Sequence, residues 1–123
     1  MSLRCLLVDD NRLYLAAARA LLETEGVVVV DTVSTIAEAR RQTDRLRPDV
    51  ALVDIKLNGE SGFDLARDLA GQAPPTPVIL VSTHDGDEYA DLIAASPAIG
   101  FVSKARLSAR AVEQLLAAHA GNR

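Results

Sequence analysis

Acidic, hydroxyl and lysine side chains follow four of the short apolar runs in this sequence. These residues are Asp9, Asp10, Asp54, Ser82, Thr83, Ser103 and Lys104. Two carboxylates about 4 Å apart repel each other by roughly 4 kcal/mol near a protein surface, and three carboxylates compound the repulsion. Since one lysine offsets only one charge, we expect either a carboxyl group with a raised pKa or a hard divalent cation among these acids.

Among cations, Mg2+ suits this set of oxygen ligands best. It prefers octahedral geometry, keeps several bound waters and often binds beside phosphate. Ca2+ fits less well, because nothing in the sequence resembles a cage of six to eight oxygens. Zinc lacks its usual ligands, because Cys5 lies inside an apolar run and only His84 is near the acidic residues. The sequence therefore predicts Mg2+ as the cofactor.

A carboxylate beside a metal ion, a hydroxyl group and a lysine is a set suited to phosphoryl transfer. Asp54 can attack phosphorus to form an acyl phosphate. Mg2+ and Lys104 would neutralise charge on the equatorial oxygens, while a hydroxyl group donates a hydrogen bond to one of them. No glycine-rich nucleotide fingerprint follows any apolar run, so the expected donor is a phosphorylated protein or a small acyl phosphate.

The elements that would position these residues alternate along the whole chain. Apolar runs of strand length occupy residues 3–8, 27–30, 50–54, 78–81 and 99–102. Segments of helical periodicity follow each run, and Thr35, Ser61 and Ser108 are the expected caps of three of them. Their predicted inward residues are Leu13, Ala16, Ala17, Ala20 and Leu21; Ile36, Ala39, Thr43 and Leu46; Leu65, Ala66 and Leu69; Tyr89, Leu92 and Ile93 in a helix over 85–95; and Val112, Leu115 and Leu116.

Five continuous apolar strands alternating with five helices predict an α/β sandwich of three layers. Strands without polar alternation are typical of a parallel sheet covered by helices on both faces. Five strands are too few for an eight-stranded barrel, which leaves the open, doubly wound form. In such a sheet the carboxyl ends of the strands meet at one edge, so we expect the acids, hydroxyls and Lys104 to converge there.

Composition limits the classes of function. A length of 123 residues is typical of one domain, and we expect a single domain over residues 1–123 with no output domain. The net charge of -4 disfavours nucleic-acid binding by this chain alone. One cysteine cannot form an internal disulfide, and no apolar run approaches the roughly 20 residues of a membrane span. We therefore expect a cytoplasmic protein that does not enter the membrane.

Four motifs give the chain a family resemblance that covers essentially its whole length. They are LLVDDN (6–11), LVDIKLNGESG (52–62), VILVST (78–83) and GFVSKA (100–105). Together they resemble the receiver domains of bacterial response regulators, and THDGDEYADLIA (83–94) is similar to receivers of the NarL/LuxR type. The resemblance implies a flavodoxin-like fold with strand order 2-1-3-4-5, the order expected of receiver domains.

The resemblance also implies a signalling domain of a two-component system rather than an enzyme. Such a domain takes a phosphoryl group from a histidine kinase or phosphotransfer protein and assists its own phosphorylation and dephosphorylation. The phosphoryl group switches a surface that binds a downstream protein. A homodimer through the fourth-helix face is a further family-level expectation.

By position, the resemblance makes Asp54 the phosphoacceptor. Asp10 is then a direct Mg2+ ligand, Asp9 acts mainly through water, and the backbone carbonyl of Lys56 supplies another ligand. Lys104 binds the phosphate. Ser82 also contacts the phosphate and stands at the position of the switch hydroxyl, and Phe101 stands at that of the switch aromatic residue.

Several residues depart from the family pattern. Asn58 and Ala105 stand where the family usually has prolines, the second of them in the cis form. A cis peptide before alanine costs about 2.5–4 kcal/mol, so the Lys104 loop is either trans and shifted or strained. Lys56, Thr83 and His84 are the positions expected to modulate phosphate lifetime. We hypothesise that Lys56 shields the acyl phosphate from water and slows its hydrolysis.

Simpler interpretations remain for single residues and for the whole chain. Asp9 or Asp10 can cap a helix, Phe101 can be plain core, and Lys56 can be exposed without a role. Besides a receiver that acts alone or in a phosphorelay, the chain can be the regulatory part of a transcription factor with a DNA-binding helix-turn-helix, which a native gene ending near residue 123 would exclude. It can also be an interaction module independent of phosphorylation.

Overall fold

The main sheet of the protein has five parallel strands in the order β2-β1-β3-β6-β7. The computed structural model describes residues 2–83 and 86–121. Because β4 and β5 form a separate two-stranded sheet, the order of the main sheet is the predicted 2-1-3-4-5, and the flavodoxin-like fold is confirmed. The strands are β1 (Arg4–Val8), β2 (Val28–Val33), β3 (Val50–Asp54), β6 (Val78–Ser82) and β7 (Gly100–Ser103).

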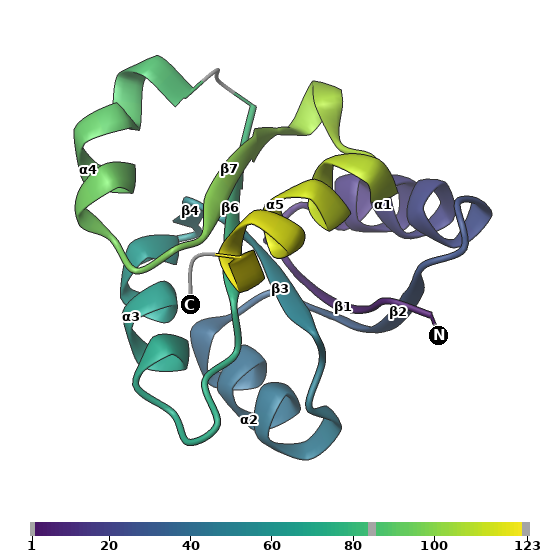
Figure 1. Cartoon of the computed structure of the whole chain (residues 1–123), viewed down its shortest axis with the longest axis horizontal. Coiled ribbons are helices and arrows are strands. Elements are labelled where there is room, and N and C mark those ends of the chain that lie inside the picture. Colours follow the sequence, from purple (N-terminus) through teal and green to yellow (C-terminus); the bar gives the residue numbers. More distant parts are fainter. Residues whose placement is uncertain (1, 84–85, 122–123) are drawn as a thin grey trace.

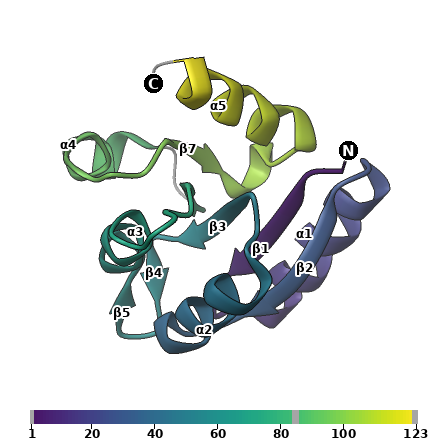
Figure 2. The same ribbon diagram turned by 60° about the horizontal axis from the view of Figure 1, so that its bottom comes forward.

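Five helices cover the two faces of this sheet. They are α1 (Arg12–Thr24), α2 (Ile36–Leu46), α3 (Gly62–Ala70), α4 (Ala90–Ala95) and α5 (Ala109–Gly121). Helices α1 and α5 lie on one face, and α2, α3 and α4 lie on the other (Figure 1, Figure 2). The predicted caps are confirmed, since the side chains of Thr35, Ser61 and Ser108 each accept a hydrogen bond from a backbone amide in the first turn.

Alternate residues of the strands build two hydrophobic cores, one on each face of the sheet. On β1, Cys5 and Leu7 belong to the core under α1 and α5, whereas Leu6 and Val8 belong to the core under α2 and α3. All four side chains are buried, so burial on both faces accounts for the continuous apolar run in the sequence. Burial on both faces therefore fixes the positions of β1 and β3, and with them the residues at the carboxyl ends of these strands.

The prediction of which face of α1 points into the core is wrong. Leu13 is 84% exposed and Leu21 is 42% exposed, and the alanines predicted with them are exposed as well. The buried residues are Leu15, Ala18 and Leu22. Since α1 carries apolar residues around most of its circumference, helical spacing alone does not distinguish the buried face from the exposed one.

Two further predictions about local structure need correction. The segment 85–95 was expected to be one α-helix, but a 3-10 helix, η1 (Gly86–Tyr89), precedes α4, and Asp85 lies outside the described residues. Leu92 is 56% exposed, whereas Tyr89 and Ile93 pack on the core as predicted. Neighbouring positions on a short helix point about 100° apart, so Leu92 and Ile93 do not both reach the core.

The segment after β3 is a hairpin and not only a loop. Strands β4 (Lys56–Leu57) and β5 (Glu60–Ser61) pair antiparallel around a two-residue turn. Asn58 and Gly59 both have positive φ, 37° and 90°, as an Asn-Gly hairpin turn requires. Proline is fixed near -65° and does not adopt this conformation, which explains why Asn58 departs from the family pattern.

Within residues 2–83 and 86–121, no helix has both the length and the apolar character that crossing a membrane requires.

Candidate functional site

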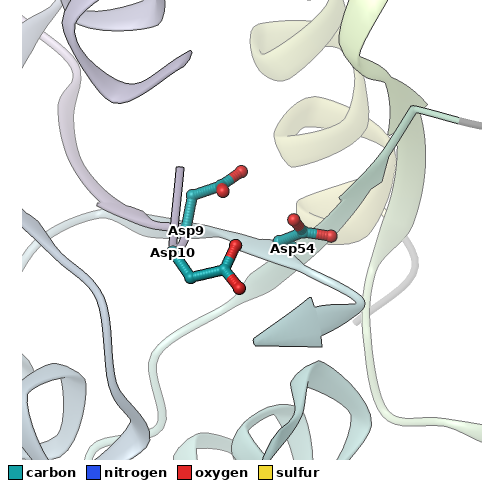
Figure 3. A group of neighbouring side chains, drawn as sticks. All are labelled: Asp9, Asp10 and Asp54. Carbon is teal, nitrogen blue, oxygen red and sulfur yellow. The ribbon is translucent and has the colours of Figure 1, made fainter. Parts of the chain in front are cut away.

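Three carboxylates meet at the carboxyl ends of β1 and β3. These strands pair in parallel with Val8 opposite Val53, so Asp9 and Asp54, the residues that follow, lie at the same level of the sheet. One carboxylate oxygen from each of Asp9, Asp10 and Asp54 lies within 4.8 Å of the other two. Figure 3 shows the three side chains grouped at this edge. The structure therefore brings together the acids that the sequence predicted to converge.

The three acids differ in burial. Asp9 is 1% exposed, Asp54 is half-buried and Asp10 is exposed. Burial raises the pKa of Asp9, and the negative charge of Asp54 adds to this effect; contacts with Lys104 and the Asn11 amide lower it only in part. The carboxyl group with a raised pKa that the sequence predicted as one alternative is thus Asp9.

Lys104 lies between two of these acids. Its Nζ is 2.6 Å from Oδ2 of Asp9 and donates a hydrogen bond to Oδ2 of Asp54 at 3.1 Å. Asp9 Oδ2 is buried and accepts no well-directed hydrogen bond from the described residues, so its short contact with Lys104 is an ion pair with a poor hydrogen-bond angle. Burial lowers the pKa of Lys104, but its contacts with Asp9 and Asp54 outweigh that effect and raise the pKa overall.

The backbone at Lys104 settles one alternative left open by the sequence. Lys104 begins a single 3-10 turn, η2 (Lys104–Arg106), directly after β7. Of the peptide bonds in the described ranges, only the one before Pro74 is cis, so the bond between Lys104 and Ala105 is trans. The trans peptide still leaves the ammonium group within hydrogen-bond distance of Asp54.

The donor set fits a magnesium ion. It consists of carboxylate oxygens, the ligands that Mg2+ takes in preference to nitrogen or sulfur. The buried Oδ2 of Asp9 accepts no well-directed hydrogen bond from the described residues, and the exposed Asp10 leaves room for the waters that Mg2+ retains. A divalent cation would relieve the repulsion among the three acids.

Lys56, two residues after Asp54, contacts the Asp54 carboxylate through its backbone. The amide of Lys56 donates a hydrogen bond to Oδ1 of Asp54 at 3.1 Å, which fixes that oxygen. The Lys56 side chain is exposed and extends toward η1, where its Nζ lies 5.9 Å from the centre of the Tyr89 ring. Interaction with the Tyr89 side chain raises the pKa of Lys56, and nearby negative charges add to this.

The other predicted residues in the described part of the chain lie on β6 and β7 or directly after β6. Ser82 is buried at the end of β6 opposite Ser103, and Thr83 is exposed. Phe101 is half-buried on β7 and packs on the core under α2 and α3. His84 lies outside the described residues. The switch roles of Ser82 and Phe101, the ligand role of the Lys56 carbonyl and the lifetime roles of Lys56, Thr83 and His84 stay predictions.

Asn11 is a site residue that the sequence reasoning missed. Its amide donates to Oδ1 of Asp9 at 2.8 Å, and its side chain accepts from the Tyr14 amide at 3.1 Å. Asn11, and not Asp9 or Asp10, therefore caps α1. The preference of asparagine for this position was an available signal. Tyr14 was missed as well. In the structure the Nζ of Lys104 lies 4.2 Å from the centre of its ring.

Gly62 is the third missed residue. A Cβ atom at this position would lie 2.2 Å from the backbone oxygen of Asp54, which is too close for any side chain. The amide of Gly62 also donates to the backbone oxygen of Ile55 at 2.8 Å. The start of α3 therefore packs directly against the backbone of Asp54, and a glycine after a serine cap is the corresponding sequence signal.

Comparisons with known proteins agree with this geometry. A family model described as the response regulator receiver domain matches residues 5–116. The response regulator GacA of Pseudomonas viridiflava is 29% identical over 122 residues, which cover 98% of this chain and 57% of GacA. The DNA-binding transcriptional activator EvgA of Escherichia coli K12 is 26% identical over 83% of this chain and 50% of its own length. The chain thus spans about half the length of these curated relatives.

A solved structure shares the same fold. It is a two-component response regulator of the LuxR family from Aurantimonas sp. SI85-9A1, which superposes with a TM-score of 0.85 at 27% identity. The match covers 96% of this chain and 87% of the other. The similarity to LuxR-type regulators that residues 83–94 indicated therefore extends to the structure.

Proposed function

The chain belongs to the response regulator receiver family, and on that premise we propose that Asp54 accepts a phosphoryl group from a histidine kinase or a small acyl phosphate. The observation that carries the proposal is the position of the Asp54 carboxylate. One of its oxygens is fixed by the Lys56 amide, the other faces Lys104, and two more acids lie within 4.8 Å. This arrangement combines a nucleophile with charges that stabilise a transferring phosphoryl group.

The transfer forms one bond and breaks one. A carboxylate oxygen of Asp54 bonds to phosphorus while the bond from phosphorus to the leaving group breaks, and the leaving group, acetate or a histidine nitrogen, keeps the electron pair. Lys104 moves its hydrogen bond from Asp54 to a phosphoryl oxygen and offsets part of the new charge. Its present distance of 3.1 Å from Oδ2 makes this a short displacement.

Asp9, Asp10, Asp54 and the Lys56 carbonyl would hold Mg2+, with Asp10 as a direct ligand and Asp9 acting mainly through water. When bound, Mg2+ supplies positive charge to the oxygens of the phosphoryl group. The buried, poorly satisfied oxygen of Asp9 supports this assignment.

Phosphorylation would then change a protein-binding surface. The phosphoryl group adds about two negative charges beside β6 and β7. Ser82 would move toward it, and Phe101, now half-buried, would turn into the vacated space. Repacking at α4, β7 and α5 shifts a pre-existing equilibrium between two states, and a downstream protein would bind one of them.

Intact-mass spectrometry tests the acceptor. Incubation with acetyl phosphate and Mg2+ should add the mass of one phosphoryl group to the parent chain and to Asp64→Ala, a matched control because Asp64 is an exposed carboxylate on α3. Asp54→Ala should gain nothing. An unmodified parent chain, or equal modification of Asp54→Ala, would contradict the proposal.

A second candidate function is regulation of a DNA-binding protein. It is favoured by the relative EvgA, a DNA-binding transcriptional activator of which this chain spans half. Since the net charge of -4 disfavours DNA contact by this chain, its contribution would be control of dimerisation. Sedimentation of the phosphorylated chain should then show a dimer that the unphosphorylated chain does not form, and an unchanged monomer would argue against this role.

A further inference from the structure

The ammonium group of Lys104 has a third neighbour besides Asp9 and Asp54. Its Nζ lies 4.2 Å from the centre of the Tyr14 ring. The Lys104 side chain is only 12% exposed, and Tyr14 is half-buried against the core under α1 and α5. A cation over an aromatic face is attracted by the ring, and more strongly when water is largely excluded.

The position of Tyr14 is fixed by the same residue that holds Asp9. Asn11 donates its amide hydrogen to Asp9 and accepts from the Tyr14 amide with its side chain. Tyr14, Asp9 and Asp54 line a shared cavity of about 10 Å³, which has room for one water at most. The ring is therefore closely packed beside the two carboxylates that contact Lys104.

The backbone at Lys104 gives the side chain little support of its own. The 3-10 turn η2 contains three residues, and its cap, Ser103, makes no side-chain hydrogen bond to it. Ala105, the next residue, is exposed. The location of the ammonium group thus depends on its side-chain contacts, which include the carboxylates of Asp9 and Asp54 and the Tyr14 ring.

We infer that Tyr14 is a positioning residue that holds the Lys104 ammonium group beside Asp54. Its contact with Lys104 is a property of the protein alone, and its effect on phosphoryl transfer rests on the proposed function. Burial raises the pKa of Tyr14, with the charges of Asp9 and Asp54 contributing, so its ring contributes as a neutral group. The inference assigns the ring, and not the hydroxyl group, as the active part.

The contact is tested by NMR on the metal-free, unphosphorylated protein. A ring so close to Nζ should shift the signals of the Lys104 ε-methylene group upfield, and the Lys104→Met variant identifies those signals. The shift should persist in Tyr14→Phe and in the control Tyr89→Leu, whose ring faces Lys56. It should disappear in Tyr14→Leu, and in Tyr14→Met if the leucine variant does not fold. An identical Lys104 signal in the parent chain and in the folded Leu or Met variant would overturn the inference.

The consequence for transfer is tested by a double-mutant cycle. Removing the ring in Tyr14→Leu should slow phosphorylation by acetyl phosphate about fivefold to thirtyfold, as loss of a largely desolvated cation–π contact implies, while Tyr14→Phe keeps the parent rate. In the Lys104→Met background the same change should have no further effect. Equal slowing in both backgrounds would overturn the inference, because it would show that Tyr14 acts through packing alone. A parent chain that takes no phosphoryl group would instead contradict the proposed function, and the NMR result would still decide the role of Tyr14.

Discussion

Gly62→Ala should damage the protein because of one close approach. The added Cβ atom would lie 2.2 Å from the backbone oxygen of Asp54 and 3.0 Å from the Cα atom of Ile55. Both neighbours are backbone atoms of the segment that carries Asp54, so no side-chain rotation relieves the clash. Overpacking of this kind costs about 1–3 kcal/mol, and a contact with backbone belongs at the upper end. For a chain of this length we expect a fall in Tm of roughly 10 °C.

Gly71→Ala is the matched control. Gly71 ends the same helix with an ordinary φ of -84°, and a Cβ atom there would meet nothing closer than 3.5 Å. This variant should be neutral or more stable by up to about 1 kcal/mol, because alanine restricts the unfolded chain. Thermal unfolding followed by circular dichroism compares the two variants. A Gly62→Ala protein that melts within about 2 °C of the control would refute the close packing of α3 against Asp54.

Two further predictions concern charged residues at the site. The pKa of Asp9 in the folded protein is raised above its ordinary value of 3.8, so this carboxyl group ionises more easily in the unfolded chain. The stability that protonated Asp9 contributes is therefore complete below a pH of about 3.8 and is lost as the pH rises through the raised pKa. Urea unfolding in EDTA across this range should show that loss in the parent chain and not in Asp9→Asn; parallel pH profiles would refute it. Lys56→Asn should lose its phosphoryl group faster than the parent chain if Lys56 shields the acyl phosphate, and equal dephosphorylation rates would exclude that role.

The sheet and its acidic edge were predictable because the signals are local and parallel pairing does the rest. The strands β1, β3 and β6 are short apolar runs, because both of their faces are buried, and a polar residue ends or follows each of them. Once five such runs alternate with helices, Asp9, Asp54 and Lys104 must follow strands that end at the same edge. The order of the strands came from the family resemblance.

Other features depend on packing that a sequence pattern does not specify. The buried face of α1 was mistaken because leucines and alanines occur on several sides of that helix, and only docking on the sheet selects Leu15, Ala18 and Leu22. The contact between Tyr14 and Lys104 likewise joins residues far apart in the chain. The β4–β5 hairpin is different, because its Asn58-Gly59 turn was an available signal that was not used.

The central claim is that Asp54 takes the phosphoryl group with the help of a metal ion. Borohydride reduces an aspartyl phosphate to homoserine, so peptide mass mapping after reaction with acetyl phosphate identifies the modified residue. We predict homoserine at position 54 when Mg2+ is present and none in EDTA. Conversion at Asp9 or Asp10, or equal conversion at Asp54 without a metal ion, would contradict the account.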